Sequence, residues 1–230
     1  MNRLVVWTQV FGLFAAAVAA GWTAEPGTKQ EEAIAEIKKL GGKVIVDEES
    51  PDKPVIGVNL ANTQVTDAGL RHLKRLTRLK SLQLSFAPFT NAGLENIQGL
   101  TQLEDLELIQ TKVTDAGLKH LKGLVKLKTL ALDYTDVADA GLEHLGTLTQ
   151  LQELDLSGTS VTGKGLEHLK GLTQLRQLYL GDSKVSDVGL EHLSGLTQLQ
   201  LLDLGYTKVS DAGLKHVKGL TKLKTLDLAC

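Results

Sequence analysis

The chain has 230 residues, and its 25 Lys and Arg against 27 Asp and Glu give a formal net charge of −2 at pH 7. This balance excludes a global electrostatic field that would attract nucleic acid or an anionic membrane. The single cysteine, Cys230, excludes an internal disulfide framework and a cysteine-based zinc cluster. Stability must therefore come from packing.

Residues 1–20 have the layout of a secretory signal peptide. A basic residue, Arg3, precedes an apolar run over 4–14 and a small-residue stretch over 15–20. We expect cleavage after Ala19 or Ala20. An uncleaved membrane anchor is the alternative, because 4–21 reaches the lower limit of membrane-spanning length. Either outcome predicts an exported protein that is periplasmic, surface-bound or secreted.

Residues 21–54 are interpreted as a linker and an N-terminal cap. Ile34, Ile37 and Leu40 recur at a spacing of three, which predicts an amphipathic helix over 29–40. The glycines at 41 and 42 end this helix, and 43–46 predicts a short strand before a loop. Both elements would cover the exposed end of the array that follows.

Residues 55–230 form an array with a period of 24 residues. Each unit carries a Leu-x-x-Leu-x-Leu strand phrase, and this period predicts a stacked solenoid in which alternate strand residues enter the core. We expect eight parallel strands on one side and seven short helices on the other. The recurring glycines stand at 69, 93, 117, 141, 165, 189 and 213.

Polar residues recur at the turns of each unit. Asp67 is expected to favour the positive end of a helix dipole. Helix N-caps are predicted at Thr66, Thr114, Ser186 and Ser210. Left-handed helix ends are predicted at Gly99, Gly123, Gly171, Gly195 and Gly219. Hydroxyls that can bond the turn backbone stand at Thr63, Thr111, Thr135, Thr159, Ser183 and Thr207.

With these phrases the chain resembles the leucine-rich repeat superfamily over about residues 55–230. The phrase at 111–118, Thr-Lys-Val-Thr-Asp-Ala-Gly-Leu, is similar to the repeats of exported bacterial leucine-rich repeat proteins, and 33–44 is similar to their leader. The resemblance implies a right-handed α/β solenoid, or horseshoe, with a parallel sheet on the concave face and helices on the convex face. It implies a non-catalytic protein-binding scaffold without a cofactor. The Asp-x-Gly-Leu phrase is also similar to F-box substrate receptors, which would imply a ubiquitin-ligase adaptor.

One helical position carries a column of histidines, with Asn96 in the gap. A metal site or an enzyme built on this column is the alternative function. We favour a repeat-consensus role, because a zinc site needs a closed set of ligands and a catalytic group is normally unique in its chain. No catalytic residue is predicted. The histidines are His72, His120, His144, His168, His192 and His216.

The outward strand positions vary most between units, so partner binding is predicted there. Carboxylates cluster beside tyrosines in this set, as at interface hot spots, although an ordinary solvated face is the alternative. The expected partner is a protein, with a glycan as a second possibility and calcium as a lesser one. The predicted binding residues are Asp105, Glu107, Asp133, Glu153, Asp155, Tyr134, Tyr179, Leu201, Asp203 and Tyr206.

Two segments depart from the repeat. The unit at 86–110 carries Phe86, Pro88 and an Ile109 that we expect to be exposed, and it is either a partner contact or a drifted repeat. The final strand phrase ends at Leu228 with no polar cap behind it. An open edge invites pairing. We therefore expect either a homodimer through this end or continuation in a longer array.

Overall fold

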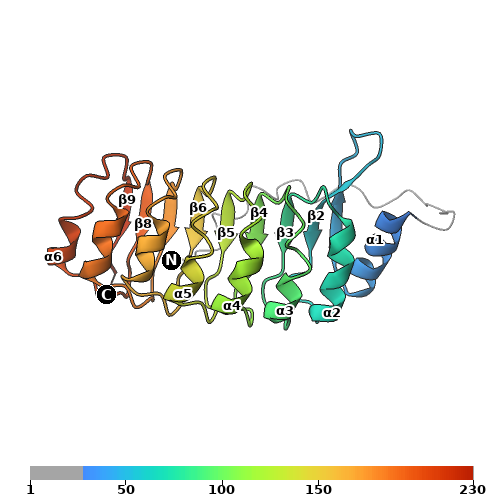
Figure 1. Cartoon of the computed structure of the whole chain (residues 1–230), viewed down its shortest axis with the longest axis horizontal. Helices are drawn as coiled ribbons and strands as arrows, with labels where there is room; N and C mark the ends of the chain where they lie inside the picture. Colours follow the sequence, from blue (N-terminus) through green and yellow to red (C-terminus); the bar gives the residue numbers. More distant parts are fainter. Residues whose placement is uncertain (1–27, 230) are drawn as a thin grey trace.

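The structure is a computed structural model that describes residues 28–229. The predicted signal peptide, 1–20, lies outside the described residues, and so does Cys230. Nine strands form one sheet in strict sequence order, from β1 to β9. The short helices form a second layer, so the molecule is an elongated array of similar units (Figure 1).

The eight strands β2 to β9 run parallel, as predicted. Each leucine at a strand centre lies beside its counterpart 24 residues later, as Leu106 does beside Leu130 and Leu130 beside Leu154. The open α/β leucine-rich solenoid is thereby confirmed. The strands are β2 (Val55–Asn59), β3 (Ser81–Gln83), β4 (Asp105–Glu107), β5 (Thr129–Ala131), β6 (Glu153–Asp155), β7 (Gln177–Tyr179), β8 (Leu201–Asp203) and β9 (Thr225–Asp227).

Seven units carry a short helix between residues 67 and 214. Two of these helices continue as 3-10 turns, and two others are 3-10 throughout. The segments are α2 (Asp67–Leu70), η3 (Arg71–Arg75), α3 (Asn91–Leu94), α4 (Asp115–Leu118), η4 (Lys119–Leu121), α5 (Asp139–Leu142), η5 (Gly165–Leu169), η6 (Asp187–Leu193) and α6 (Asp211–Leu214).

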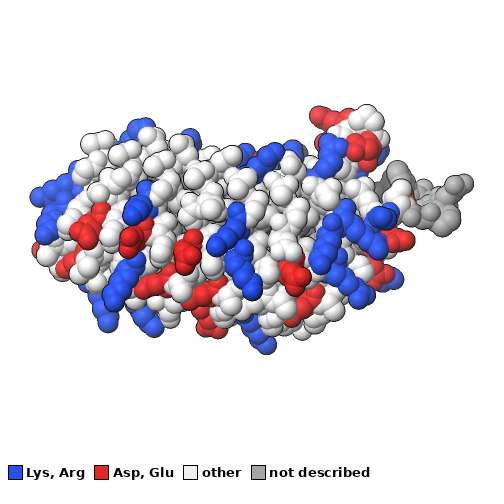
Figure 2. Space-filling model, viewed as in Figure 1, with Lys and Arg blue, Asp and Glu red and all other residues white. Residues whose placement is uncertain are grey.

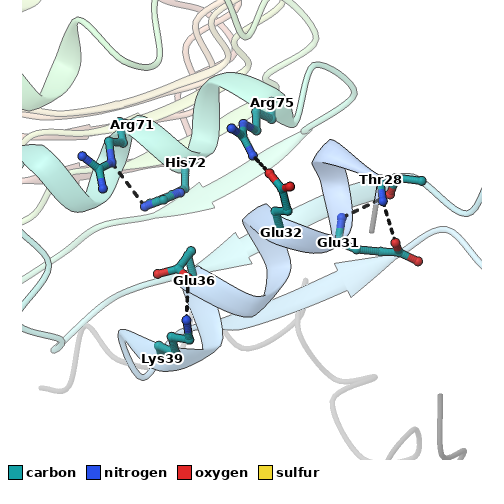
Figure 3. A network of polar contacts seen from close by, with 8 residues as sticks. All are labelled: Thr28, Glu31, Glu32, Glu36, Lys39, Arg71, His72 and Arg75. Carbon is teal, nitrogen blue, oxygen red and sulfur yellow. Dashed lines mark hydrogen bonds and ion pairs between the residues drawn. The ribbon is translucent and has the colours of Figure 1, made fainter. Parts of the chain in front are cut away.

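A helix and an antiparallel strand stand before the first parallel strand. Helix α1 (Lys29–Lys39) begins with a capping box between Thr28 and Glu31. It ends at Gly41, whose φ of 83° is left-handed. Strand β1 (Lys43–Val46) pairs antiparallel with β2. An ion pair between Glu32 of α1 and Arg75 of η3 joins the helix to the first unit (Figure 3).

Leucines from strands and helices fill the space between the two layers. Nearly all are fully buried, including Leu106 and Leu130 at strand centres and Leu121 and Leu145 in the helical layer. Burial of this apolar surface is the main source of stability. The last unit differs, because Leu226 is 37% exposed and Leu228 is 41% exposed.

The predicted row of hydroxyls bonds the turn backbone. The Thr135 hydroxyl donates to the Leu132 carbonyl at 2.6 Å, and Thr111 and Thr159 repeat the bond with Leu108 and Leu156. These threonines are buried, so each bond satisfies a carbonyl that water does not reach. Each bond lies within its own unit.

The left-handed positions are not the predicted helix-end glycines. Of the described glycines, only Gly41 and Gly158 have a positive φ. The helical segments instead close through turns of three residues, as from Leu100 N–H to the Ile97 carbonyl. Left-handed backbone recurs at another position, just after each strand, with φ between 51° and 65°. Its residues are Asn62, Phe86, Gln110, Tyr134, Gly158, Asp182 and Tyr206.

The predicted N-caps are only partly formed. The Ser210 hydroxyl accepts a bond from Ala212 N–H, whereas Thr66, Thr114 and Ser186 make no such side-chain bond. At five helix starts the polar side chain of the first residue is instead bonded to the following unit, which the sequence reasoning missed.

A carboxylate at the start of one helix holds the start of the next helix. Asp67 accepts bonds from the backbone nitrogen and the hydroxyl of Thr90, at 2.7 and 2.8 Å. Asp187 holds Ser210 with two bonds of 2.7 Å, which lower the pKa of its carboxyl. We call this arrangement the inter-unit clasp. It links consecutive units on the helical side, as the sheet links them on the other.

The clasp explains the glycine period. A Cβ on Gly141 would lie 2.6 Å from the Asp115 carboxylate, and one on Gly213 would lie 2.5 Å from the Asp187 carboxylate. Such distances are below any real carbon–oxygen contact, so a side chain cannot stand there while the clasp remains. At Gly93, Gly141, Gly165 and Gly213 the preceding unit's carboxylate occupies the space that a side chain would need.

At one junction between units of the described chain, the clasp position carries no side chain. Gly163 stands where the other units place Asp or Asn, and the helical segment of its unit begins two residues later, at Gly165. Gly163 instead meets Gly189 of the next unit, where a Cβ would lie 2.2 Å from the Gly163 Cα. Backbone therefore packs directly against backbone at this junction.

Candidate functional site

The concave face, defined as the side of the sheet turned away from the helices, gathers the predicted carboxylates in two rows. Asp105 and Glu153 share one row, separated by Thr129 in the strand between them. Glu107 and Asp155 share the next row, separated by Ala131. The structure therefore brings four predicted acidic residues together on β4 and β6, with only small side chains between them.

Burial raises the pKa of three of these carboxyls, Asp105, Glu107 and Glu153. The pKa of Glu153 is raised to about 7, first by burial and then by the charges of Asp155 and Asp105. Burial also raises the pKa values of Asp105 and Glu107, against the hydrogen bonds from Thr129 and Gln83. The face thus holds negative charge in a partly desolvated setting that a cationic partner would stabilise.

Two of the predicted residues close turns after their strands. Asp203 is only 4% exposed, and its carboxylate accepts a bond from Gly205 N–H at 2.9 Å. Asp155 accepts in the same way from Ser157 N–H at 2.8 Å. Asp203 therefore also closes the turn after β8, and its contact with a partner stays a prediction. The sequence signal for this turn is a short aspartate side chain two residues before a glycine.

The predicted tyrosines lie near the acidic rows, with Tyr134 after β5, between β4 and β6, and with Tyr179 and Tyr206 in later units. Tyr179 of β7 stands beside Asp155 and donates its hydroxyl proton to Gln177 at 2.7 Å. Tyr134 and Tyr206 occupy left-handed turn positions and are 51% and 67% exposed. Leu201 of β8 is half-buried next to Gln177.

The left-handed aromatic residues are unusual. A bulky residue with positive φ is strained, and such strain often accompanies a functional surface. Phe86 shares this position and is 47% exposed, whereas the Phe89 side chain of the same departing unit is buried. Ile109 is half-buried rather than exposed, since it follows the buried Leu108 in the turn.

Two histidines of the column make surface contacts, whereas the Nδ1 atom of His144 is buried without a hydrogen-bond partner. His72 accepts a bond from Arg71 Nε at 3.4 Å (Figure 3), and His120 lies 3.3 Å from the Gln98 side-chain oxygen. Asn96, in the gap, bonds the backbone of Asp67 and Gly93. Within residues 28–229, no three His, Cys, Asp or Glu side chains gather to hold a metal ion.

A small hollow at the N-terminal end of the concave face escaped the sequence reasoning. Gly57, without a side chain, lies beneath Ile45, and the other lining residues are Lys43, Val58, Asn59, Ser81 and Gln83. The sequence feature that could have revealed this hollow is Gly57, a glycine at an outward strand position. Elsewhere, basic and acidic side chains alternate along the array without one sign dominating in the view of Figure 2.

The comparisons with known proteins agree with this architecture. The family model for the leucine rich repeat matches residues 149–209. The crystal structure of internalin C2 from Listeria monocytogenes is similar, with 24% identity and a TM-score of 0.62, over 91% of this chain and 100% of that one. A comparison with curated proteins finds no match.

Two receptor structures are also similar. A plant peptide hormone receptor, RGFR1 in complex with RGF2, shares 22% identity at a TM-score of 0.57, and the match covers 80% of this chain and 28% of the receptor. A TDR receptor shares 17% identity at a TM-score of 0.56, over 76% of this chain and 34% of that one. These structural similarities show that this chain has the leucine-rich repeat fold. None of the helices in its described part is long and apolar enough to cross a membrane.

Proposed function

We propose that the protein is a non-catalytic scaffold that binds a protein partner through the concave face of its solenoid. The observation that carries this proposal is the set of half-buried carboxylates beside Tyr179 on β4, β6 and β7. Desolvation disfavours their charge, so a partner that supplies cationic donors would regain free energy that the free protein lacks.

The rest of the molecule supports this placement. The leucines, clasp residues and recurring glycines pack the units against one another. The outward strand residues do not have this packing role. The similar receptor structure is a complex with RGF2, and its fold presents the same kind of sheet. We further propose residues 1–20 as an export signal, 21–54 as linker and cap, 55–230 as the array, and action outside the cytoplasm.

Affinity capture with paired variants tests the proposal. One bait carries Glu107→Ala, Glu153→Ala and Tyr179→Ala on the concave face. The matched control carries Glu95→Ala, Glu143→Ala and Glu191→Ala, three exposed glutamates of the helical side. We expect a partner that the control and the unchanged chain retain and the concave variant loses. Loss from the control alone would contradict concave-face binding, and capture of a glycan would redefine the partner.

A further inference from the structure

Side chains on the concave face of the first three strands form a regular grid with one gap. Strand register places Ile45, Gly57 and Ser81 in one row and Lys43, Asn59 and Gln83 in the next row. Gly57 stands in the middle of its row and has no side chain, so the grid is open there. The hollow over Gly57 has a volume of about 10 Å³. It has room for one group the size of a water molecule or a methyl group.

The surface inside this hollow is almost entirely apolar. The Ile45 side chain leans over Gly57, where an added Cβ would lie 2.9 Å from the Ile45 Cδ1 atom. Gly57 and Val58 are buried beneath it. A trapped water molecule needs two to four polar partners, which an apolar floor does not provide. The hollow therefore suits a methyl group better than a water molecule.

Hydrogen-bond donors surround the apolar floor. The Asn59 carboxamide oxygen accepts a bond from Ala61 N–H at 2.9 Å, which leaves the amino group of the same side chain to donate elsewhere. The Ser81 hydroxyl makes no hydrogen bond with any residue of the described chain. Gln83 differs, because its amino group donates to Glu107 at 2.9 Å. Two neutral groups at the rim of the hollow can therefore donate to a bound molecule.

Lys43 supplies the only charge among the residues that line the hollow. Lys43 is exposed, and it forms no ion pair with another residue between 28 and 229. An ammonium group with three donors, an amino group with two and a hydroxyl together favour an anion with several acceptor oxygens. A methyl group next to a carboxylate meets both requirements, and this is the chemistry of a C-terminal alanine.

The charges along the concave face complement a chain that enters the hollow by its carboxyl end. Gly57, Ser81 and Asp105 follow one another in a single row across β2, β3 and β4. The two strand spacings from Gly57 to Asp105 amount to about 10 Å. An extended peptide covers this distance in about three residues. A terminal carboxylate beside Lys43 therefore brings the third residue before it over Asp105, where a lysine meets an opposite charge.

We propose that the hollow over Gly57 binds the C-terminal alanine of the protein partner. The alanine methyl group fills the hollow, and the terminal carboxylate accepts bonds from Lys43, Asn59 and Ser81. A glycine terminus leaves the hollow empty, and a larger side chain exceeds it. This inference rests on the proposed concave-face function and names the end of the partner that meets the first strands.

Peptide titrations of the ¹⁵N-labelled full chain test the proposal. The probe is acetyl-Gly-Lys-Gly-Ser-Ala with a free C-terminal carboxylate. Matched peptides end in alanine amide, glycine or leucine, and another carries norleucine in place of lysine. N-acetylalanine and inorganic phosphate test small anions. We expect saturable shifts of the Gly57 and Ser81 amides with a Kd of about 1 mM for the probe, and binding about fivefold weaker for every other compound.

Variants separate the charge from the hollow. We expect Lys43→Met to weaken binding of the probe about fivefold and Lys43→Arg to retain it. Lys38→Met is the control, because it removes one exposed positive charge from α1 without touching the hollow. Gly57→Ala fills the hollow, so it should abolish the preference for alanine over glycine at the peptide terminus. Amide spectra of each variant establish that β1 and β2 remain paired before titration.

Several results would overturn the proposal. These are no saturable shift up to about 10 mM probe, equal binding of the alanine amide or glycine peptide, or unchanged binding by Lys43→Met. Equal binding of N-acetylalanine would assign the hollow to a small carboxylic acid, and tighter binding of phosphate would assign it to an inorganic anion. Failure here, with capture still dependent on Glu107, Glu153 and Tyr179, would leave the proposed function standing. Probe binding without such capture would retain the hollow as a site and remove the proposed partner surface.

Discussion

The carboxylate of Asp139 accepts two hydrogen bonds from Thr162 in the next unit, at 2.7 Å from the backbone nitrogen and 2.6 Å from the hydroxyl oxygen. The first bond satisfies an N–H at the edge of a turn, and the second orients the Thr162 side chain. The residue thus joins two units on the side of the molecule where no sheet connects them.

Removal of this clasp should cost stability. We expect Asp139→Ala to lower the free energy of unfolding by about 1–2 kcal/mol, because the Thr162 N–H loses its partner. Urea unfolding followed by circular dichroism measures the change. Asp211→Ala is the control, since Asp211 also starts a helix but makes no such bond within residues 28–229. Equal losses in both variants would assign the effect to the helix dipole.

Substitution by alanine at two different glycines should change the free energy of unfolding in different ways. Gly141→Ala places a Cβ 2.6 Å from the Asp115 carboxylate, and we expect a loss of about 1–3 kcal/mol despite alanine's better helix propensity. Gly171 has nothing within 4 Å of its added Cβ. Gly171→Ala should be neutral or stabilising by up to about 1 kcal/mol. The urea midpoints of the two variants compare them directly, and similar losses would refute the clasp as the cause of the glycine period.

Stability should fall as pH rises through the range where Glu153 ionises. Its pKa of about 7 in the folded protein lies above the ordinary value of 4.5, so the folded state holds this proton more tightly than the unfolded state. The stabilising contribution is complete below about pH 4.5 and is lost as pH approaches and passes 7. We expect Glu153→Gln to gain about 1 kcal/mol over the unchanged chain near pH 8, after allowance for solvent screening.

Unfolding curves near pH 5 and pH 8 measure this effect. The control is Glu143→Gln on the exposed helical side, which should track the unchanged chain at both values. If Glu153→Gln lost the same stability as the unchanged chain between the two pH values, another group would be responsible for the pH dependence.

The histidine column should bind no stoichiometric metal. Chelator treatment is expected to leave the melting temperature unchanged, and metal analysis of the purified chain should find less than one equivalent. The reason is that the histidines stand in an open row and no closed ligand set exists among the described residues. A stoichiometric metal that disappears in the double variant His144→Ala and His168→Ala would contradict this.

The period of 24 residues was enough to predict the strands, their direction and the leucine core, because each feature follows from spacing alone. Within one unit, the sequence suggests only a helix-dipole role for Asp67. In the structure its hydrogen-bond partner is Thr90 of the next unit. Sequence spacing does not reveal such a contact until the units are stacked.

The candidate site was only partly predictable from the sequence, because alternation along a strand is visible in the sequence and contacts in the following turn are not. Alternation along each strand correctly placed Glu107 and Glu153 on the concave face. It did not reveal that Asp203 bonds to Gly205 N–H or that Ser157 is buried, because both depend on the turn after the strand. The left-handed turn at Tyr134 was also hidden, since sequence favours glycine or asparagine there.

The direct contact between Gly163 and Gly189 limits how freely the repeats can be rearranged. An array of identical modules could be lengthened or shortened at any boundary. Here an aspartate in place of Gly163 would bring its Cβ to 2.6 Å from the Gly189 backbone nitrogen. The modules on either side of this junction are therefore a matched pair, and a redesign of the array should move them together.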